Sequence, residues 1–112
     1  MASLSVDTMG LDASGTSITW ASASGSGDSF SNNGRTVVVC MNGATSACAV
    51  TVAANQTVTD ASLSVPDLTV SVAASTTIAI GPLPKVTFND ASGDVALTYA
   101  NESTLQIALI AW

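Results

Sequence analysis

Two cysteines lie close together in the stretch CMNGATSAC, which runs from Cys40 to Cys48. They could hold a metal ion, carry out redox chemistry, form a disulfide or pack as small apolar side chains. A zinc site needs four ligands, and the chain has no histidine and no second pair of cysteines. A redox site is not indicated, because the spacing is not CxxC and no neighbouring base would lower the pKa of a thiol. Packing and a disulfide remain as interpretations.

The residues between the cysteines predict how the two thiols are placed. Asn-Gly in NGATS (42–46) is typical of a hairpin turn, which would set Cys40 opposite Cys48. Directly opposite residues have Cβ atoms about 4.5–5.5 Å apart, slightly more than a disulfide prefers. We therefore expect two reduced, buried thiols. A disulfide that forms on exposure to an oxidising exterior is the alternative.

A second group of polar residues is NDASGD (89–94), in which Asp90 and Asp94 flank Ser92. Asp, Asn and Gly are the residues expected in a turn, and we predict a hairpin loop here. A weak calcium site is the alternative. The stretch lacks both the spacing of an EF-hand loop and its terminal glutamate.

The chain offers few candidate residues for catalysis or for binding a cofactor. Without histidine there is no Ser-His-Asp or Cys-His arrangement, and no glycine-rich phosphate-binding motif occurs. We therefore expect no enzymatic activity, cofactor or metal. Eight acidic and two basic residues give a net charge of −6, which argues against binding nucleic acid or an anionic membrane. No apolar run is long enough for a membrane helix, and the start does not resemble a secretory signal, so we expect synthesis in a cytoplasm.

The low content of charge favours a particular class of protein. Charged residues make up 9% of the chain, against about 25% in an average soluble domain. Proteins that live free in solution use charge to prevent association. A surface of Ser, Thr, Ala and Asn tolerates close contact with other proteins, so the composition favours a subunit of an assembly.

Apolar residues alternate at period two along most of the chain, which predicts short strands separated by Gly, Asn and Pro turns. The expected strands lie within 17–23, 35–41, 47–54, 68–74, 76–82, 85–88, 95–99 and 104–112. The Gly/Ser/Asn-rich segment 25–34 is expected to be a loop. About eight short strands predict an all-β, antiparallel β-sandwich, of which the jelly roll is one form.

The patterning divides the chain into two parts. Residues 18–112 are expected to form a single β-sandwich domain, and residues 1–17, which are less regular, an N-terminal arm or edge strand. Four residues are candidates for contact with a partner, three as aromatics and one as a rare cation: Trp20, Phe30, Trp112 and Arg35.

Residues 31–112 resemble a group of small β-rich virion proteins of tailed bacteriophages. The similarity is carried by SNNGRTVVVCMNGATSACAVTV, VPDLTVSVAASTTIAIGPLP and FNDASGDVALTYANESTLQIALIA. Such proteins show an Asn-Gly-Arg-Thr entry to a strand, an Asn-Gly hairpin and an Ile-Gly-Pro segment. Where an Ala-Gly turn is expected before Ile-Gly-Pro, this chain has Ala74-Ser75. Proteins of this group are taken to be capsid decoration (cement) proteins or minor virion components.

The resemblance implies a function, a location and partners. A cement protein binds the outer surface of the expanded head and bridges subunits of the major capsid protein, often as a homotrimer. The protein would then be synthesised in the host cytoplasm and located on the capsid exterior. One alternative is a low-copy structural protein of the head–tail junction or tail. A second alternative is a carbohydrate-binding adhesion module.

Overall fold

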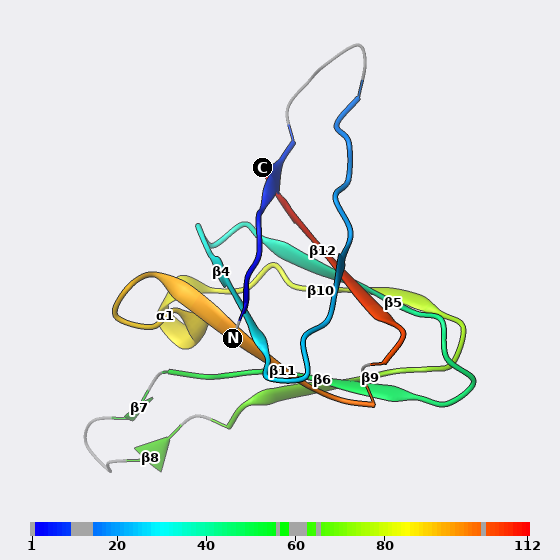
Figure 1. Cartoon of the computed structure of the whole chain (residues 1–112). Coiled ribbons are helices and arrows are strands. Elements are labelled where there is room, and N and C mark those ends of the chain that lie inside the picture. Colours follow the sequence, from blue (N-terminus) through cyan, green and yellow to red (C-terminus); the bar gives the residue numbers. More distant parts are fainter. Residues whose placement is uncertain (1, 10–14, 56, 59–62, 65, 102) are drawn as a thin grey trace.

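The computed structural model describes residues 2–9, 15–55, 57–58, 63–64, 66–101 and 103–112. These residues form twelve strands and one short helix. Ten of the strands make two sheets that pack face to face as an all-β sandwich, with the apolar core between them (Figure 1).

The first sheet, sheet A, has the strand order β1-β4-β11-β6-β9. The pairs among β4, β11, β6 and β9 are antiparallel, whereas β1 runs parallel to β4 at one edge. The strands are β1 (Ala2–Ser3), β4 (Asp28–Ser31), β11 (Asp94–Ala100), β6 (Cys48–Val52) and β9 (Leu68–Val72).

The second sheet, sheet B, has the order β10-β5-β12-β2, and β3 pairs with β12 as well. A separate hairpin of β7 and β8 is inserted between β6 and β9. The strands of sheet B are β2 (Asp7–Thr8), β3 (Ala21–Ser22), β5 (Val37–Asn42), β10 (Thr77–Ile80) and β12 (Leu105–Ala111), and those of the hairpin are β7 (Thr57–Val58) and β8 (Leu63–Ser64).

The connections identify the sandwich as a jelly roll. From β3 onward, each link between successive strands of the two sheets crosses from one sheet to the other, except for the link from β6 to β9. The resulting orders, β4-β11-β6-β9 and β3-β12-β5-β10, pair strands that are distant in the sequence. Two four-stranded sheets connected in this way are the arrangement of a jelly roll, and the predicted fold class is confirmed.

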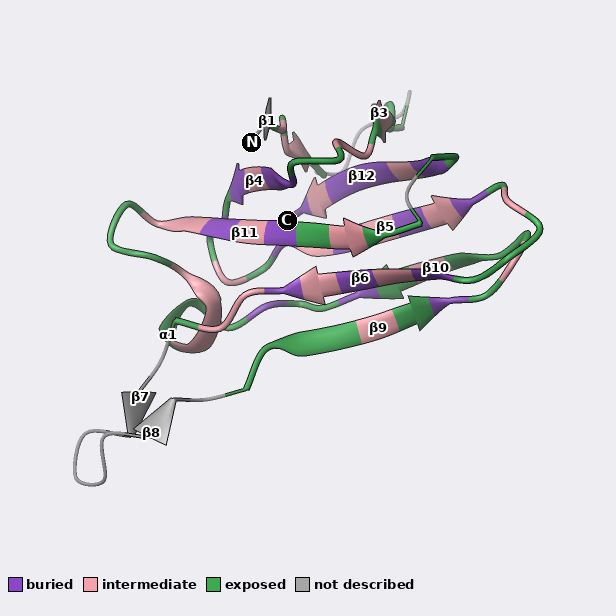
Figure 2. Ribbon diagram, turned by 60° about the horizontal axis from the view of Figure 1, so that its bottom comes forward, coloured by how far each residue is buried: buried purple, intermediate pink, exposed green. Residues whose placement is uncertain are grey.

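The predicted alternation matches the burial of the central strands. Val38 and Cys40 on β5, and Val50 on β6, face the core, while the residues between them are only half-buried. The same alternation is visible along β5, β6 and β11 in Figure 2. The strands predicted within 35–41, 47–54, 68–74, 76–82, 95–99 and 104–112 are present.

The predicted hairpin at NGATS is wrong. β5 and β6 belong to different sheets, so residues 43–47 form an arch that carries the chain from sheet B to sheet A. Cys40 therefore pairs with Ile78 and Ile107, and Cys48 pairs with Val72. A hairpin and an arch both bury alternate residues, so the pattern of apolar residues alone does not distinguish them.

Two further predictions from local pattern are wrong. KVTF forms the single-turn helix α1 (Lys85–Phe88) rather than a strand, and NDASGD consequently links α1 to β11 instead of closing a hairpin. A four-residue apolar pattern is too short to separate the two periods. The expected loop 25–34 contains strand β4, in which Asp28 and Phe30 face inward. The predicted strand near Trp20 is reduced to β3.

The described part of the N-terminal segment lies along one side of the sandwich. β1 adds to sheet A and β2 adds to sheet B, so residues 2–8 pass from one sheet to the other. Leu4 and Val6, between these strands, pack against the core. In this structure residues 2–8 contribute edge strands to their own sandwich.

Candidate functional site

The two thiols lie in the core. Cys40 and Cys48 form no disulfide, and their side chains are 0% and 1% exposed. Burial, and to a smaller degree the neighbouring Cys48, raise the pKa of the Cys40 thiol from 9.0 to about 12. A thiol of this kind stays protonated at neutral pH and is a poor nucleophile and a poor metal ligand. The prediction of two buried thiols is confirmed, and they pack as apolar side chains.

The carboxylate of Asp90 is used by the backbone of its own turn. Its Oδ1 accepts hydrogen bonds from the backbone N–H groups of Ser92 (2.8 Å) and Asp94 (3.0 Å). Within the part of the chain that the structure describes, no group of three or more acidic or cysteine side chains could hold a metal ion. NDASGD is a turn whose first aspartate stabilises it.

A buried carboxylate joins β4 to β11. Asp28 is fully buried, and its Oδ2 accepts hydrogen bonds from Tyr99 Oη (2.6 Å) and from the backbone N–H of Ser24 (3.1 Å). Burial, and then the hydrogen bond to Asp28, raise the pKa of Tyr99 well above its usual range. The two residues are 71 positions apart in the sequence, and a sequence pattern gives no sign of the contact.

Two buried asparagines fix the loops. Asn32 Nδ2 donates to Leu83 O (3.0 Å) and to Asn89 Oδ1 (2.7 Å), which ties the end of β4 to both sides of α1. Asn42 Nδ2 donates to Ser46 O and Val72 O, each at 3.0 Å, which closes the arch and joins it to β9. These amides hold the fold in place, and the remaining candidates for function lie on the surface.

The four predicted contact residues differ in their exposure. Phe30 is 1% exposed and belongs to the core, so the prediction that it contacts a partner is wrong. The cause is the strand β4, whose alternation turns Phe30 inward. Trp20 and Trp112 remain 37% and 47% exposed, and Arg35 is exposed.

The outer face of sheet A is covered by short side chains. Its paired residues include Thr51 opposite both Thr69 and Thr98, and the hydroxyls of Thr51 and Thr69 lie 3.3 Å apart. The residues of this face are Ser29, Ser31, Ala49, Thr51, Thr69, Ser71, Asp94, Ala96, Thr98 and Ala100. Except for Asp94 at one corner, they carry only methyl and hydroxyl groups.

The outer face of sheet B is apolar. Paired residues share a face of a sheet, so Val37 lies beside Ile110, and Val39 lies between Ala108 and Ala79. Met41 follows on β5, with polar Gln106 and Thr77 on either side. We call this surface the apolar face; its central residues are Val37, Val39, Met41, Ala79, Ala108 and Ile110.

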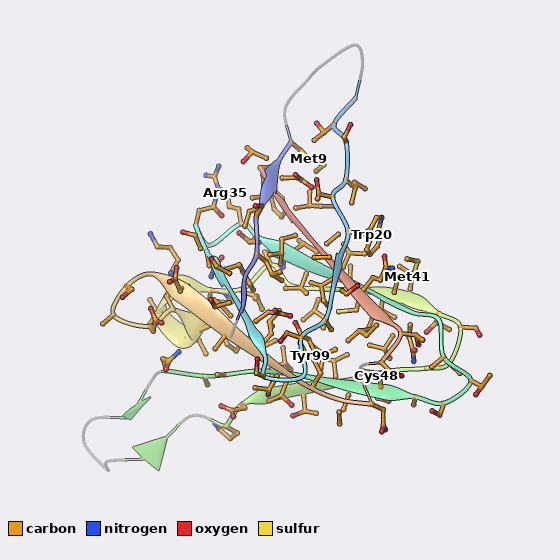
Figure 3. All side chains as sticks on the ribbon, viewed as in Figure 1. Met9, Trp20, Arg35, Met41, Cys48 and Tyr99 are labelled. Carbon is orange, nitrogen blue, oxygen red and sulfur yellow. The ribbon has the colours of Figure 1, made fainter. Side chains whose placement is uncertain are left out.

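The exposed aromatic residues border the apolar face. Val37 pairs with Ile110, and Arg35 and Trp112 lie two residues beyond this pair, at the same end of the face. The backbone N–H of Met9 donates to Ala111 O (2.6 Å), which brings Met9 beside Trp112. In Figure 3, Met9, Trp20 and Met41 lie on the side turned away from β6 and β9 of sheet A, whereas Tyr99 and Cys48 lie toward these strands and Arg35 lies beside the end of β4.

The structure therefore brings Trp20 and Trp112 to the border of this surface and Arg35 to its end, two residues before Val37. Three of the six large hydrophobic side chains exposed among the described residues lie at this border: Met9, Trp20 and Trp112. The sequence does contain a signal for the apolar face. β5 is apolar on both of its sides, because Val37, Val39 and Met41, which face outward, are as apolar as the inward residues between them.

No pocket opens among the described residues. No described helix has the length and apolar character to span a membrane. Comparison of the chain with protein families, with curated proteins and with solved structures finds no match.

Proposed function

We propose that this protein is a structural subunit of a bacteriophage particle, a capsid decoration protein that binds the outside of the expanded head and bridges subunits of the major capsid protein. The observation that carries the proposal is the near absence of charge on both outer faces of the sandwich. The described charged residues lie on an edge strand, in the core, in loops and α1, or at strand ends: Asp7, Asp28, Arg35, Asp67, Lys85, Asp90 and Asp94.

Charge-free sheet faces suit a subunit that is covered on two sides. Burying an unpaired charge in a contact is costly, whereas methyl and hydroxyl groups can pack against a protein at little cost. A bridging protein needs more than one such surface. We assign the outer face of sheet A, which carries almost only methyl and hydroxyl groups, to contact with the shell.

The mechanism is stabilisation by linkage. A subunit that binds only the assembled shell lowers the free energy of that state by RT ln(1 + [L]/Kd) at each occupied site. Because a shell offers many equivalent sites, weak contacts at each of them add to a large total. The rigid jelly roll, a fold that also occurs in viral capsid proteins, supports this role by analogy of fold alone.

The test is the copy number of this chain in purified particles, measured by quantitative mass spectrometry against the major capsid protein. A ratio near one, or a simple fraction such as about one-third for a trimer-type lattice, is the expected result. A handful of copies would instead place the protein at the head–tail junction or in the tail. Absence from the particle would overturn the structural role.

A carbohydrate-binding module is the second candidate, favoured by the exposed indoles of Trp20 and Trp112. Jelly rolls also occur in lectins, and aromatic rings stack on apolar faces of ligands. Binding to a glycan array that is lost in Trp20→Ala and Trp112→Ala would favour this candidate over the capsid role.

A further inference from the structure

The apolar face has the composition of the centre of a protein interface. Its middle is aliphatic, and Trp, Met and Arg, which are enriched in interfaces, stand at its border. Polar residues surround the aliphatic middle: Asp7, Ser22, Thr77 and Gln106. Sheet A covers only the opposite side of sheet B. On the apolar face Ala108 is 1% exposed, whereas Val37, Val39, Met41 and Ile110 are half-buried and Ala79 is exposed.

The apolar face has the size of the centre of an interface. The strands of sheet B contribute 4 residues from β10, 6 from β5, 7 from β12 and 2 each from β2 and β3. At about 3.3 Å per residue and about 4.8 Å between strands, these residues cover roughly 330 Å² before side-chain relief is counted. A standard interface buries about 800 Å² on each partner and places an apolar centre inside a polar rim. The apolar face would supply the centre, and the polar residues around it would supply the rim.

The charges at its border are arranged so that a second copy can bind. Arg35 precedes β5, on one side of β12, whereas Asp7 is on β2, on the other side of β12. A two-fold axis that lies in the interface and runs along β12 exchanges these sides. Arg35 of each copy would then meet Asp7 of the other copy, and the pairing would be reciprocal.

The net charge limits which surfaces of two copies can come into contact. Each copy carries a net charge of −6, so two copies repel each other in most orientations. The apolar face contributes no acidic residue to its centre, and its border offers one of the two cations of the chain, Arg35. Face-to-face contact at sheet B therefore brings opposite charges together where other contacts would bring like charges together.

We propose that two copies of this chain pair through their apolar faces and form an isologous dimer. The proposal goes beyond the capsid role and does not depend on it, because pairing is a property of the free protein. It departs from the homotrimer that the resemblance to cement proteins implies, since a trimer requires a contact between two different surfaces.

The test measures the mass of the purified full chain by sedimentation velocity and light scattering over a range of concentrations. The wild type is expected to be a dimer that dissociates on dilution. Val39→Asp places a carboxylate in the centre of the apolar face and is expected to raise the dissociation constant by about a hundredfold or more. Thr51→Asp is the matched control, since Thr51 faces outward from the middle of a central strand of sheet A; it should leave the dimer intact.

A second pair of variants avoids the centre of the sheet. Arg35→Asp and Asp7→Arg should each weaken the dimer, and the double variant should restore it, because the exchanged charges again face each other. Three results would overturn the proposal: a wild-type monomer at all concentrations, a wild-type trimer, or a dimer that Val39→Asp leaves unchanged while its fold is retained by circular dichroism. The copy number in particles tests the capsid role separately.

Discussion

Tyr99 on β11 donates a hydrogen bond of 2.6 Å to the carboxylate of Asp28 on β4, and this contact satisfies one oxygen of a fully buried acidic side chain. Among the described residues, the other oxygen, Oδ1, has no hydrogen-bond partner. The carboxylate therefore depends heavily on Tyr99 and on the backbone N–H of Ser24. The contact also attaches β4 to its neighbour β11 in sheet A.

We predict that Tyr99→Phe destabilises the fold by roughly 1–3 kcal/mol, because it removes one of the two donors to a buried carboxylate oxygen. The ring is retained, so the loss reports on the hydroxyl group. Chemical denaturation at neutral pH measures the change. In Asp28→Asn, the same removal of the Tyr99 hydroxyl should cost less, and a double-mutant cycle gives the coupling between the two residues. Equal costs in both backgrounds would show that the hydroxyl does not act through Asp28.

The arch between the sheets depends on Asn42. We predict that Asn42→Ala destabilises the fold by roughly 1–3 kcal/mol, because its amide is buried and bonds to carbonyls of the arch and of β9. Asn55→Ala is the control, since Asn55 is exposed and its amide makes one bond, to Phe88 O at 2.9 Å. Thermal unfolding should separate the two variants. A similar loss in both would mean that the arch has no special dependence on Asn42.

The alternation of apolar residues was sufficient to predict the strands of the core and the fold class. Val38, Cys40 and Val50 face inward as expected, because a residue's side of a strand follows from its position alone. The partners of each strand were not predictable in the same way. Cys40 and Cys48 are both buried whether the segment between them is a hairpin or an arch, and the long-range pairing of β12 with β5 decides between the two.

The errors of prediction occur where polar residues take structural roles. β4 was missed because its inward residues include Asp28, which is tolerated in the core only through its bonds to Tyr99 and Ser24. That strand carries Phe30 into the core, which removed one predicted contact residue. The other three contact residues were predicted from residue type, but their gathering around the apolar face follows from the register of β12 with its neighbours.

Stability should fall at alkaline pH. The folded state holds the proton of Cys40 up to a pKa of about 12, whereas the ordinary value is 9.0. Between these values the unfolded state binds fewer protons than the folded state, so stability decreases as pH rises, by on the order of 1 kcal/mol per pH unit for one group. Tyr99, whose pKa is also raised, adds to the loss above pH 10. Denaturation curves between pH 8 and about pH 11 measure this slope.

Cys40→Ala provides the control for the alkaline loss. It removes the titrating thiol, so the slope that begins near pH 9 should become shallower, while the part due to Tyr99 remains. The variant lowers stability at neutral pH through the small cavity it leaves, and only the change of stability with pH is compared. A slope identical to that of the wild type would show that Cys40 does not titrate on unfolding in this range.

Removal of residues 1–9 tests how the N-terminal segment contributes. If it acted as an arm that only reaches a neighbour, its loss would leave the sandwich as stable as before. The structure instead gives it edge strands in both sheets and two half-buried apolar side chains, Leu4 and Val6. We predict a loss of roughly 2–3 kcal/mol from the apolar burial alone, measured by urea denaturation of the monomeric protein at low concentration.

A point variant within the same segment separates packing from attachment. Leu4→Ser should reproduce a large part of the loss caused by the deletion, because it removes an apolar side chain that packs on the core. Ser5→Asp is the matched control, since Ser5 is exposed and adjacent, and its effect should stay within about 0.5 kcal/mol. An unchanged denaturation midpoint in both the deletion and Leu4→Ser would contradict the role of this segment in the sandwich and restore its interpretation as an arm.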